Sequence, residues 1–128
     1  MYYMIKSTKG MNYMQKINFV FIKNNERIIE ENNINCITNK DKTIFKIDGI
    51  KYTYLNNIII KEDENHIITL DFNERKCIIY LKEINNTLVL EIKNIKIKKD
   101  KNIIKIEYKI ESEENTHNII SIEYKKSS

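Results

Sequence analysis

The residue types that most often carry out chemistry are few and widely separated in this sequence. His66 and His117 lack the HExxH or HxH spacing that places two imidazoles on one metal ion. Cys36 and Cys77 lie in different predicted strands and form no CxxC pair. We therefore expect both cysteines to be small buried hydrophobic residues. We expect a structural or solvent-exposed role for both histidines, with metal binding or acid–base chemistry as the alternative.

Phosphate-binding loops and nucleophile elbows need several glycines at fixed spacing. The sequence has only Gly10 and Gly49, which excludes both motifs. Acidic pairs such as Glu30-Glu31 and Glu113-Glu114 fall at predicted turns or strand ends, where carboxylates are usually solvated. No pattern indicates a buried carboxylate with a raised pKa. The sequence therefore predicts a protein that is not an enzyme, with no catalytic residue, no cofactor and no metal site.

One stretch near the C-terminus is rich in lysine. The cluster comprises Lys93, Lys96, Lys98, Lys99, Lys101 and Lys105. A basic ribbon on a β-barrel can follow a phosphate backbone, so these lysines are candidates for nucleic-acid binding. Aromatic stacking platforms are absent from the segment, and lysine is also a common means of protecting a sheet edge. We keep a nucleic-acid or ribonucleoprotein accessory role as the alternative function and regard nucleic acid as the less favoured partner.

Five tyrosines are distributed over the predicted strands, and two of them share a face with isoleucines. Tyr108 follows Ile104 and Ile106 at a period of two, and Tyr124 follows Ile120 and Ile122. An inward tyrosine fills volume and also presents a hydroxyl that needs a partner. The candidate ligand-binding residues are therefore Tyr52, Tyr108 and Tyr124. Simple core packing is the alternative role for these side chains.

Composition limits the class of protein. The chain has 128 residues, a formal net charge of +4, 41% hydrophobic and 31% charged residues. This balance is too apolar for a disordered chain, and no segment approaches the roughly 18 apolar residues of a membrane-spanning helix. There is no signal-peptide pattern, so we expect a cytoplasmic protein without a membrane span. The 28 Ile, 18 Asn and 20 Lys against two Arg indicate A/T-rich codons, so the basic pI partly reflects codon usage.

The elements that must position these residues are β-strands, because apolar and polar residues alternate from Lys16 onward. The stretch from Lys105 to Glu111 alternates without interruption. Leu88, Leu90 and Ile92 are out of phase with Ile95 and Ile97, which predicts a β-bulge near Lys93-Asn94.

Turn signals separate the predicted strands at intervals of roughly 8–12 residues. Asp48-Gly49 is a dipeptide that favours a two-residue type I′ hairpin turn. The other predicted reversals are Asn39–Lys42, Glu62–Asn65, Asn73–Arg75, Asn85-Asn86, Lys99–Asn102 and Glu113–Thr116.

Nine or ten short strands and no helix are expected. Short connections require antiparallel neighbours, and closure buries the apolar face. The fold class is therefore all-β, an antiparallel meander closed into a small lipocalin-like (calycin) β-barrel of about 8–10 strands. We expect residues 1–14 to be a loose N-terminal extension and residues 15–126 to form a single barrel domain.

The strand and turn order of the C-terminal half resembles a known family. Residues 70–124 read LDFNERKCIIYLKEINNTLVLEIKNIKIKKDKNIIKIEYKIESEENTHNIISIEY. This segment is similar to the YwiB-like family of small bacterial proteins, a domain of unknown function. The resemblance covers residues 66–124 and, in outline, residues 16–55. It implies a bacterial protein with a lipocalin-type barrel of eight to ten strands that has space for a ligand pocket, and it carries over no catalytic residue.

These observations lead to one preferred function and two alternatives. We expect an uncharacterised cytoplasmic β-barrel protein that binds a small apolar or amphipathic ligand among its inward Ile and Tyr side chains. The alternatives are the nucleic-acid role of the Lys93–Lys105 ribbon and a structural or interaction protein that pairs through an exposed strand edge. The sequence does not determine the oligomeric state.

Overall fold

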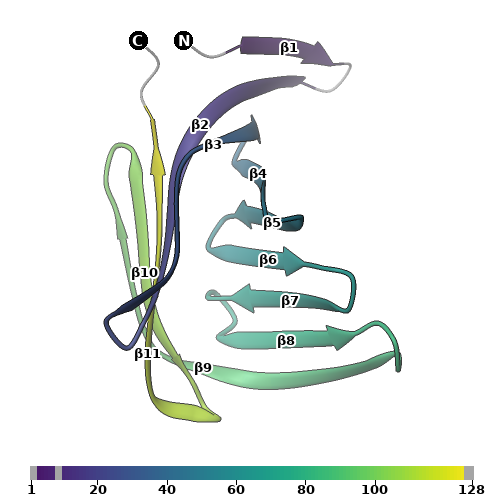
Figure 1. Cartoon of the computed structure of the whole chain (residues 1–128), viewed down its shortest axis with the longest axis vertical. Helices are drawn as coiled ribbons and strands as arrows, with labels where there is room; N and C mark the ends of the chain where they lie inside the picture. Colours follow the sequence, from purple (N-terminus) through teal and green to yellow (C-terminus); the bar gives the residue numbers. More distant parts are fainter. Residues whose placement is uncertain (1–2, 8–9, 126–128) are drawn as a thin grey trace.

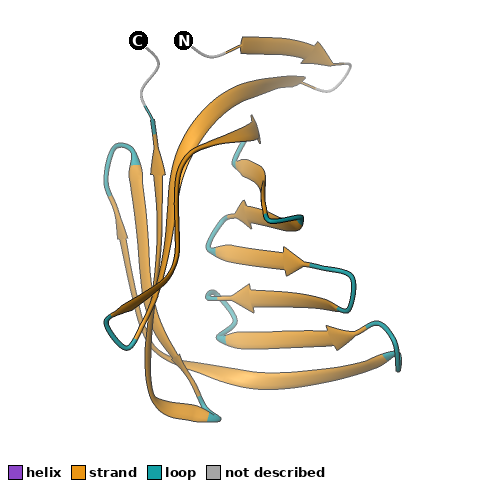
Figure 2. Cartoon of the chain, in the orientation of Figure 1, coloured by secondary structure: helices purple, strands orange, loops and turns teal. Residues whose placement is uncertain are grey.

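The computed structural model describes residues 3–7 and 10–125 of the chain, with side chains from residue 14 onward. These residues form strands and turns and contain no helix (Figure 2). The strands are β1 (Tyr3–Ser7), β2 (Gly10–Lys23), β3 (Glu26–Asn39), β4 (Lys42–Ile47), β5 (Ile50–Leu55), β6 (Ile58–Glu62), β7 (His66–Asp71), β8 (Lys76–Leu81), β9 (Asn86–Lys99), β10 (Ile103–Ile110) and β11 (Glu113–Tyr124).

The ten strands from β2 to β11 form a closed barrel. Each strand pairs antiparallel with the next in sequence, and β2 pairs with both β3 and β11, which completes the ring (Figure 1). This confirms the expected antiparallel meander closed into a barrel. β1 lies outside the ring and pairs only with the first half of β2.

The segment before residue 15 includes the first part of β2. Strand β2 begins at Gly10 and continues past residue 14, so its first part lies within the segment expected to be a loose extension. Asn12–Ile17 pair with β3, which ties this part of β2 to the barrel wall. The division into an extension and a barrel domain stays a prediction.

Asparagine builds several of the tight turns. Asn24-Asn25 and Asn56-Asn57 have positive φ at both positions, the geometry of a type I′ hairpin turn. Asp48-Gly49 has φ of 51° and 79°, which confirms the turn predicted there. Asparagine tolerates this left-handed conformation better than most residues, so a chain with only two glycines can still make many hairpins.

The predicted bulge in β9 is confirmed. Glu107 pairs with Lys96 and Lys109 with Lys93, so three steps on β9 face two steps on β10. Asn94 occupies the extra position with φ of 54°. The bulge restores the phase, so that Ile92 is buried and Ile95 and Ile97 pack against the same core.

One predicted turn was wrong. Glu113–Thr116 was expected to reverse the chain, but the turn lies at Glu111-Ser112 and β11 begins at Glu113. The polar residues instead form the exposed start of a strand. The backbone N–H of His117 donates to Asn24 Oδ1 at 2.8 Å, which fixes this strand against the β2–β3 turn.

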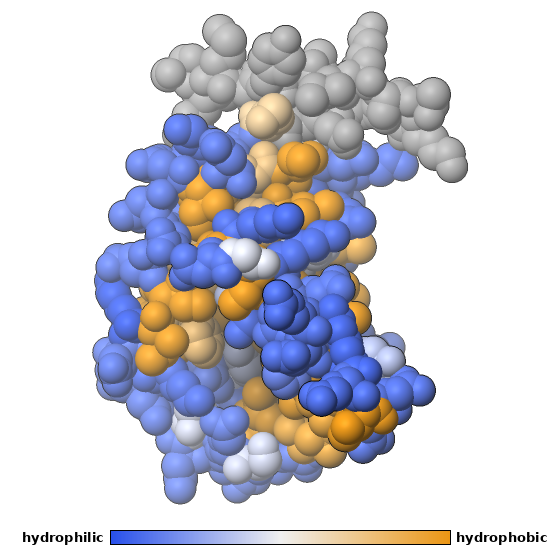
Figure 3. Space-filling model, turned by 45° about the vertical axis from the view of Figure 1, so that its right-hand side comes forward, coloured by the Kyte–Doolittle hydropathy of each residue, from blue (hydrophilic) through white to orange (hydrophobic). Residues whose placement is uncertain are grey.

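The face seen in Figure 3 is mostly hydrophilic, with apolar groups in separate patches. Ile84, Leu88 and Val89 are among the exposed large hydrophobic residues. The first half of β9 pairs with β8 alone, because pairing with β10 begins at Ile92. This part of β9 is therefore a free strand edge.

Candidate functional site

Strand register sorts the inward side chains into levels along the barrel. On β2 the inward residues are Gln15, Ile17, Phe19 and Phe21 in order. Ile17 pairs with Tyr124, Phe19 with Ile122 and Phe21 with Ile120 on β11. Neighbouring strands therefore present residues of similar chemistry at the same height.

A partition of buried side chains divides the interior near the middle. Ile17, Ile106 and Ile122 are at most 1% exposed. Beside them, the rings of Phe45 and Tyr52 stack with centroids 5.2 Å apart, and Phe19 packs against both rings. There is one space on each side of this layer, and the two spaces have no lining residue in common.

The first of these spaces is an apolar cavity of about 250 Å³. It lies toward the β2–β3 and β10–β11 turns, which are at the lower end of the barrel wall in Figure 1. The lining residues are Phe19, Phe21, Ile29, Tyr52, Ile59, Lys61, Ile68, Leu70, Cys77, Ile79, Tyr108, Ile110, Glu113 and Ile120.

Two of the three candidate tyrosines meet in this apolar cavity. Tyr52 and Tyr108 are both buried, and Tyr108 packs edge-on against Phe72 with ring centroids 5.1 Å apart. Burial raises the pKa of both phenols, so the hydroxyls are protonated at neutral pH. Neither hydroxyl makes a hydrogen bond to another side chain in the described part of the chain, which leaves both available to a ligand.

Two charged side chains line the apolar cavity, of which Lys61 is half-buried and Glu113 is exposed. Glu113 forms an ion pair with Lys23, with Nζ and Oε2 3.2 Å apart. Lys61 pairs in register with Tyr52 and Ile68, so it points inward, and it forms no ion pair with any other described residue. Lys61 was not predicted as a site residue. Its spacing of two positions from Ile59 on β6 is the sequence feature that places both residues on the same face of the strand.

The second space is an open basin of about 690 Å³ on the other side of the partition. Tyr124 lines this basin and not the apolar cavity, and its hydroxyl lies 2.7 Å from Thr43 Oγ1. Burial raises the pKa of the Tyr124 phenol. The structure therefore places the third candidate tyrosine apart from the other two.

The lysine ribbon is divided among three environments. Lys93 is paired with Glu114, with Nζ and Oε1 3.0 Å apart. Lys96 and Lys98 are exposed on the outer face of β9, out of phase with inward Ile95 and Ile97. Lys99 and Lys101 line the basin. Binding of nucleic acid by these five lysines stays a prediction.

Comparison with known proteins gives one structural likeness. No protein-family model matches the sequence, and no curated protein matches it. The crystal structure of YwiB protein from Bacillus subtilis is similar with a TM-score of 0.39 and 13% sequence identity. The alignment covers 91% of this chain and 92% of that chain. Membership of the YwiB-like family stays a prediction.

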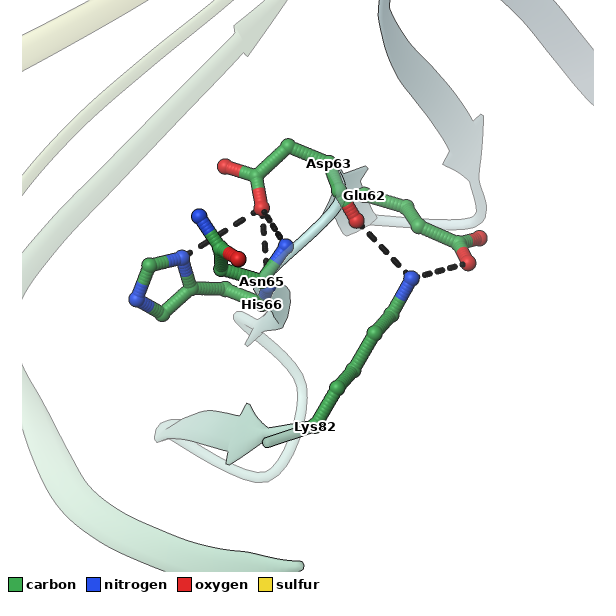
Figure 4. Close-up of polar contacts among 5 residues, drawn as sticks. All are labelled: Glu62, Asp63, Asn65, His66 and Lys82. Atoms are coloured by element: carbon green, nitrogen blue, oxygen red, sulfur yellow. Dashed lines mark hydrogen bonds and ion pairs between the residues drawn. The ribbon is translucent and has the colours of Figure 1, made fainter. Parts of the chain in front are cut away.

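The histidines occupy half-exposed positions beside carboxylates. His66 Nδ1 lies 3.3 Å from Asp63 Oδ1, and His117 Nε2 lies 3.0 Å from Glu107 Oε1. The Asp63 carboxylate also accepts the backbone N–H groups of Asn65 and His66, which lowers the pKa of Asp63 (Figure 4). These hydrogen bonds shape the β6–β7 turn.

A lysine connects that turn to the next one. Lys82 Nζ donates to Glu62 Oε2 at 3.1 Å and to the carbonyl oxygen of Asp63 at 2.8 Å (Figure 4). The contacts tie the β6–β7 turn to the β8–β9 turn. The contacts drawn in Figure 4 therefore combine side-chain pairs with hydrogen bonds to the turn backbone.

The cysteines and the acidic residues give no sign of metal chemistry in the described residues. Cys36 and Cys77 are buried free thiols, and burial raises the pKa of each. No group of three or more His, Cys, Asp or Glu side chains there could hold a metal ion. The described residues also include no helix long and apolar enough to cross a membrane.

Proposed function

We propose that this protein is a non-enzymatic β-barrel that binds a small amphipathic ligand in its apolar cavity. The observation that carries the proposal is a partly enclosed space of about 250 Å³ lined by Tyr52, Tyr108 and aliphatic side chains. A barrel packed for stability alone would fill this volume, because protein interiors contain few voids larger than a water molecule.

The size of the apolar cavity limits the ligand. An apolar cavity of about 150 Å³ accommodates benzene, and sites for drug-sized molecules span about 300–1,000 Å³. The 250 Å³ found here lies between these values. The ligand is therefore larger than benzene and smaller than most organic cofactors, in the range of a medium-chain aliphatic or a bicyclic compound.

The distribution of polar groups gives the ligand an orientation. Lys61 is half-buried, while Ile59, Cys77 and Tyr108 are buried. A carboxylate head at the mouth would pair with the Lys61 ammonium and gain a charge-assisted hydrogen bond. The apolar remainder of the ligand would then extend inward toward the Tyr108 hydroxyl.

The family relation forms part of the same proposal. It is supported by the order of strands and turns over residues 66–124, which resembles the YwiB-like pattern. If the relation holds, the strand of the YwiB protein that corresponds to β2 should also pair with two neighbours to close the ring.

Native mass spectrometry of gently purified protein is the first test. We expect an additional mass that is lost under denaturing conditions, and its value identifies the ligand class. Titration calorimetry with octanoate and octanol then tests the site directly. Binding of both compounds, with octanoate the tighter, is the expected result, because only octanoate can pair with Lys61.

Matched variants locate the binding. Ile68→Phe fills the apolar cavity and should lower the affinity for octanoate by about tenfold or more. This corresponds to a loss of about 1.4 kcal/mol or more of binding free energy. Ile78→Phe adds the same volume on the outer face of β8, because Ile78 alternates with the inward residues Cys77 and Ile79 on either side of it. This variant should leave octanoate binding unchanged.

Lys61→Gln should lower the affinity for octanoate and leave the affinity for octanol unchanged. If neither compound binds and no additional mass is found, the barrel is not a ligand carrier. If octanol binds as well as octanoate and Lys61→Gln changes nothing, the ligand is apolar without an anionic head.

A further inference from the structure

The basin at the other end of the barrel has a composition unlike that of the apolar cavity. Its residues are Gln15, Thr38, Lys40, Asp41, Thr43, Tyr54, Asn56, Lys99, Lys101, Asn102, Ile104, Tyr124 and Lys125. The two sets share no residue, and the buried layer of Ile17, Ile106 and Ile122 lies between them.

Four lysines from separate parts of the chain converge on this basin. Lys40 belongs to the β3–β4 turn, Lys99 to the end of β9, Lys101 to the β9–β10 turn and Lys125 to the segment after β11. Among the residues that the structure describes, Asp41 is the only one with a carboxylate that lines it. Asp100 lies in the same β9–β10 turn, where its carboxylate accepts the backbone N–H of Lys101.

None of the positive charges at the basin is neutralised by an ion pair with a described carboxylate, in contrast to those of three other lysines. Lys23, Lys82 and Lys93 each form an ion pair within 4.0 Å. None of the four basin lysines forms one with another described residue. Four ammonium groups around one opening repel each other and raise the local positive potential, which an anionic ligand would neutralise.

The floor of the basin adds uncharged hydrogen-bonding groups. Tyr124 and Thr43 hydroxyls lie 2.7 Å apart, and Thr38 Oγ1 donates to Gln15 Oε1 at 3.2 Å. These hydroxyls and amides come from inward positions of β2, β3, β4 and β11, so the barrel wall holds them in place. A ligand with several oxygen atoms could therefore contact ammonium groups at the rim and neutral donors below.

We propose that the basin is a second binding site, which takes a small phosphorylated molecule with at least two negative charges. The charge imbalance favours a polyanion over a monocarboxylate, and the volume of about 690 Å³ falls within the range of about 300–1,000 Å³ for small-molecule sites. The site is independent of the apolar cavity and does not rest on the function proposed for it.

Inorganic pyrophosphate is the probe, with binding to the full chain measured by titration calorimetry at low ionic strength. The double variant Lys99→Gln/Lys101→Gln removes two positive charges from the basin. It should lower the affinity for pyrophosphate by about tenfold or more, because charge-assisted contacts dominate the binding of phosphate groups. Lys96→Gln/Lys98→Gln removes the same charge from the outer face of the same strand and should change the affinity by less than about twofold, because screening weakens distant charges.

Two further measurements separate a site from general attraction to a basic protein. Pyrophosphate should perturb the NMR signals of Tyr54 and Tyr124 and leave those of Tyr52 and Tyr108 unchanged. Ile68→Phe, which fills the apolar cavity, should retain full pyrophosphate affinity. The proposal is overturned if the wild-type chain does not bind pyrophosphate, or if the two double variants lose affinity equally. A larger loss in Lys96→Gln/Lys98→Gln would also overturn it, because binding would then lie on the outer face.

Discussion

The Thr43 and Tyr124 hydroxyls show how single polar atoms are accommodated inside this barrel. They lie 2.7 Å apart, and Thr43 is 1% exposed. A buried hydroxyl without a partner costs about 1–3 kcal/mol, whereas removal of both partners can be close to neutral. The pair therefore stabilises the basin floor chiefly because neither hydroxyl is left alone.

Tyr124→Phe should lower the free energy of unfolding by about 1–3 kcal/mol, because it leaves the Thr43 hydroxyl buried without a partner. Urea denaturation followed by circular dichroism measures the effect. In Thr43→Val/Tyr124→Phe the loss should be smaller than the sum of the two single losses. Tyr80→Phe is the control, since its hydroxyl bonds to Asn85 in an exposed position. Additive losses would show that the two hydroxyls do not interact.

At the scale of the element, the bulge in β9 determines which residues face the core. Asn94 has φ of 54°, a conformation that costs an ordinary L-residue about 1–2 kcal/mol. The extra residue allows both Ile92 and Ile97 to point inward, although they are five positions apart and would otherwise lie on opposite faces.

Asn94→Val should destabilise the protein by about 1–2 kcal/mol, because a β-branched residue tolerates positive φ poorly. Asn94→Gly should leave stability nearly unchanged, since glycine adopts this conformation without strain. Thermal unfolding of the two variants gives the comparison. Asn86→Val, in the same strand without positive φ, serves as the control. Equal melting temperatures for Asn94→Val and Asn94→Gly would contradict the role of the bulge.

At the scale of the whole molecule, a layer of buried side chains separates the apolar cavity from the basin. Ile17, Ile106 and Ile122 are each at most 1% exposed, and they come from three strands. The apolar cavity and the basin, which are the two proposed binding sites, lie on either side of this layer.

Ile17→Ala should lower the free energy of unfolding by about 2–5 kcal/mol, the range for deletion of a buried aliphatic side chain. Urea denaturation measures this loss. Ile28→Ala is the control, because Ile28 is half exposed on the neighbouring strand and its truncation should have a small effect. If the two variants lost equal stability, the partition would not be the centre of the core.

Much of the fold could be predicted because it depends on local patterns. The alternation from Lys105 to Glu111, the Asp48-Gly49 turn and the bulge at Asn94 each follow from a few consecutive residues. The candidate site could be predicted only in part. Alternation with isoleucines identifies Tyr108 and Tyr124 as inward residues, but it gives no information about the position of each residue along the barrel axis.

The sequence by itself determined the strand period, most of the turn positions and the closed all-β class, because steric and hydrogen-bonding preferences act over a few residues. Only the tertiary structure decided that Tyr124 faces a basic basin while Tyr52 and Tyr108 share an apolar cavity with Lys61. Those groupings depend on the register between β2 and β11, which pairs Ile17 with Tyr124 across more than a hundred positions. Such register is set by packing of the whole closed sheet, and no local pattern encodes it.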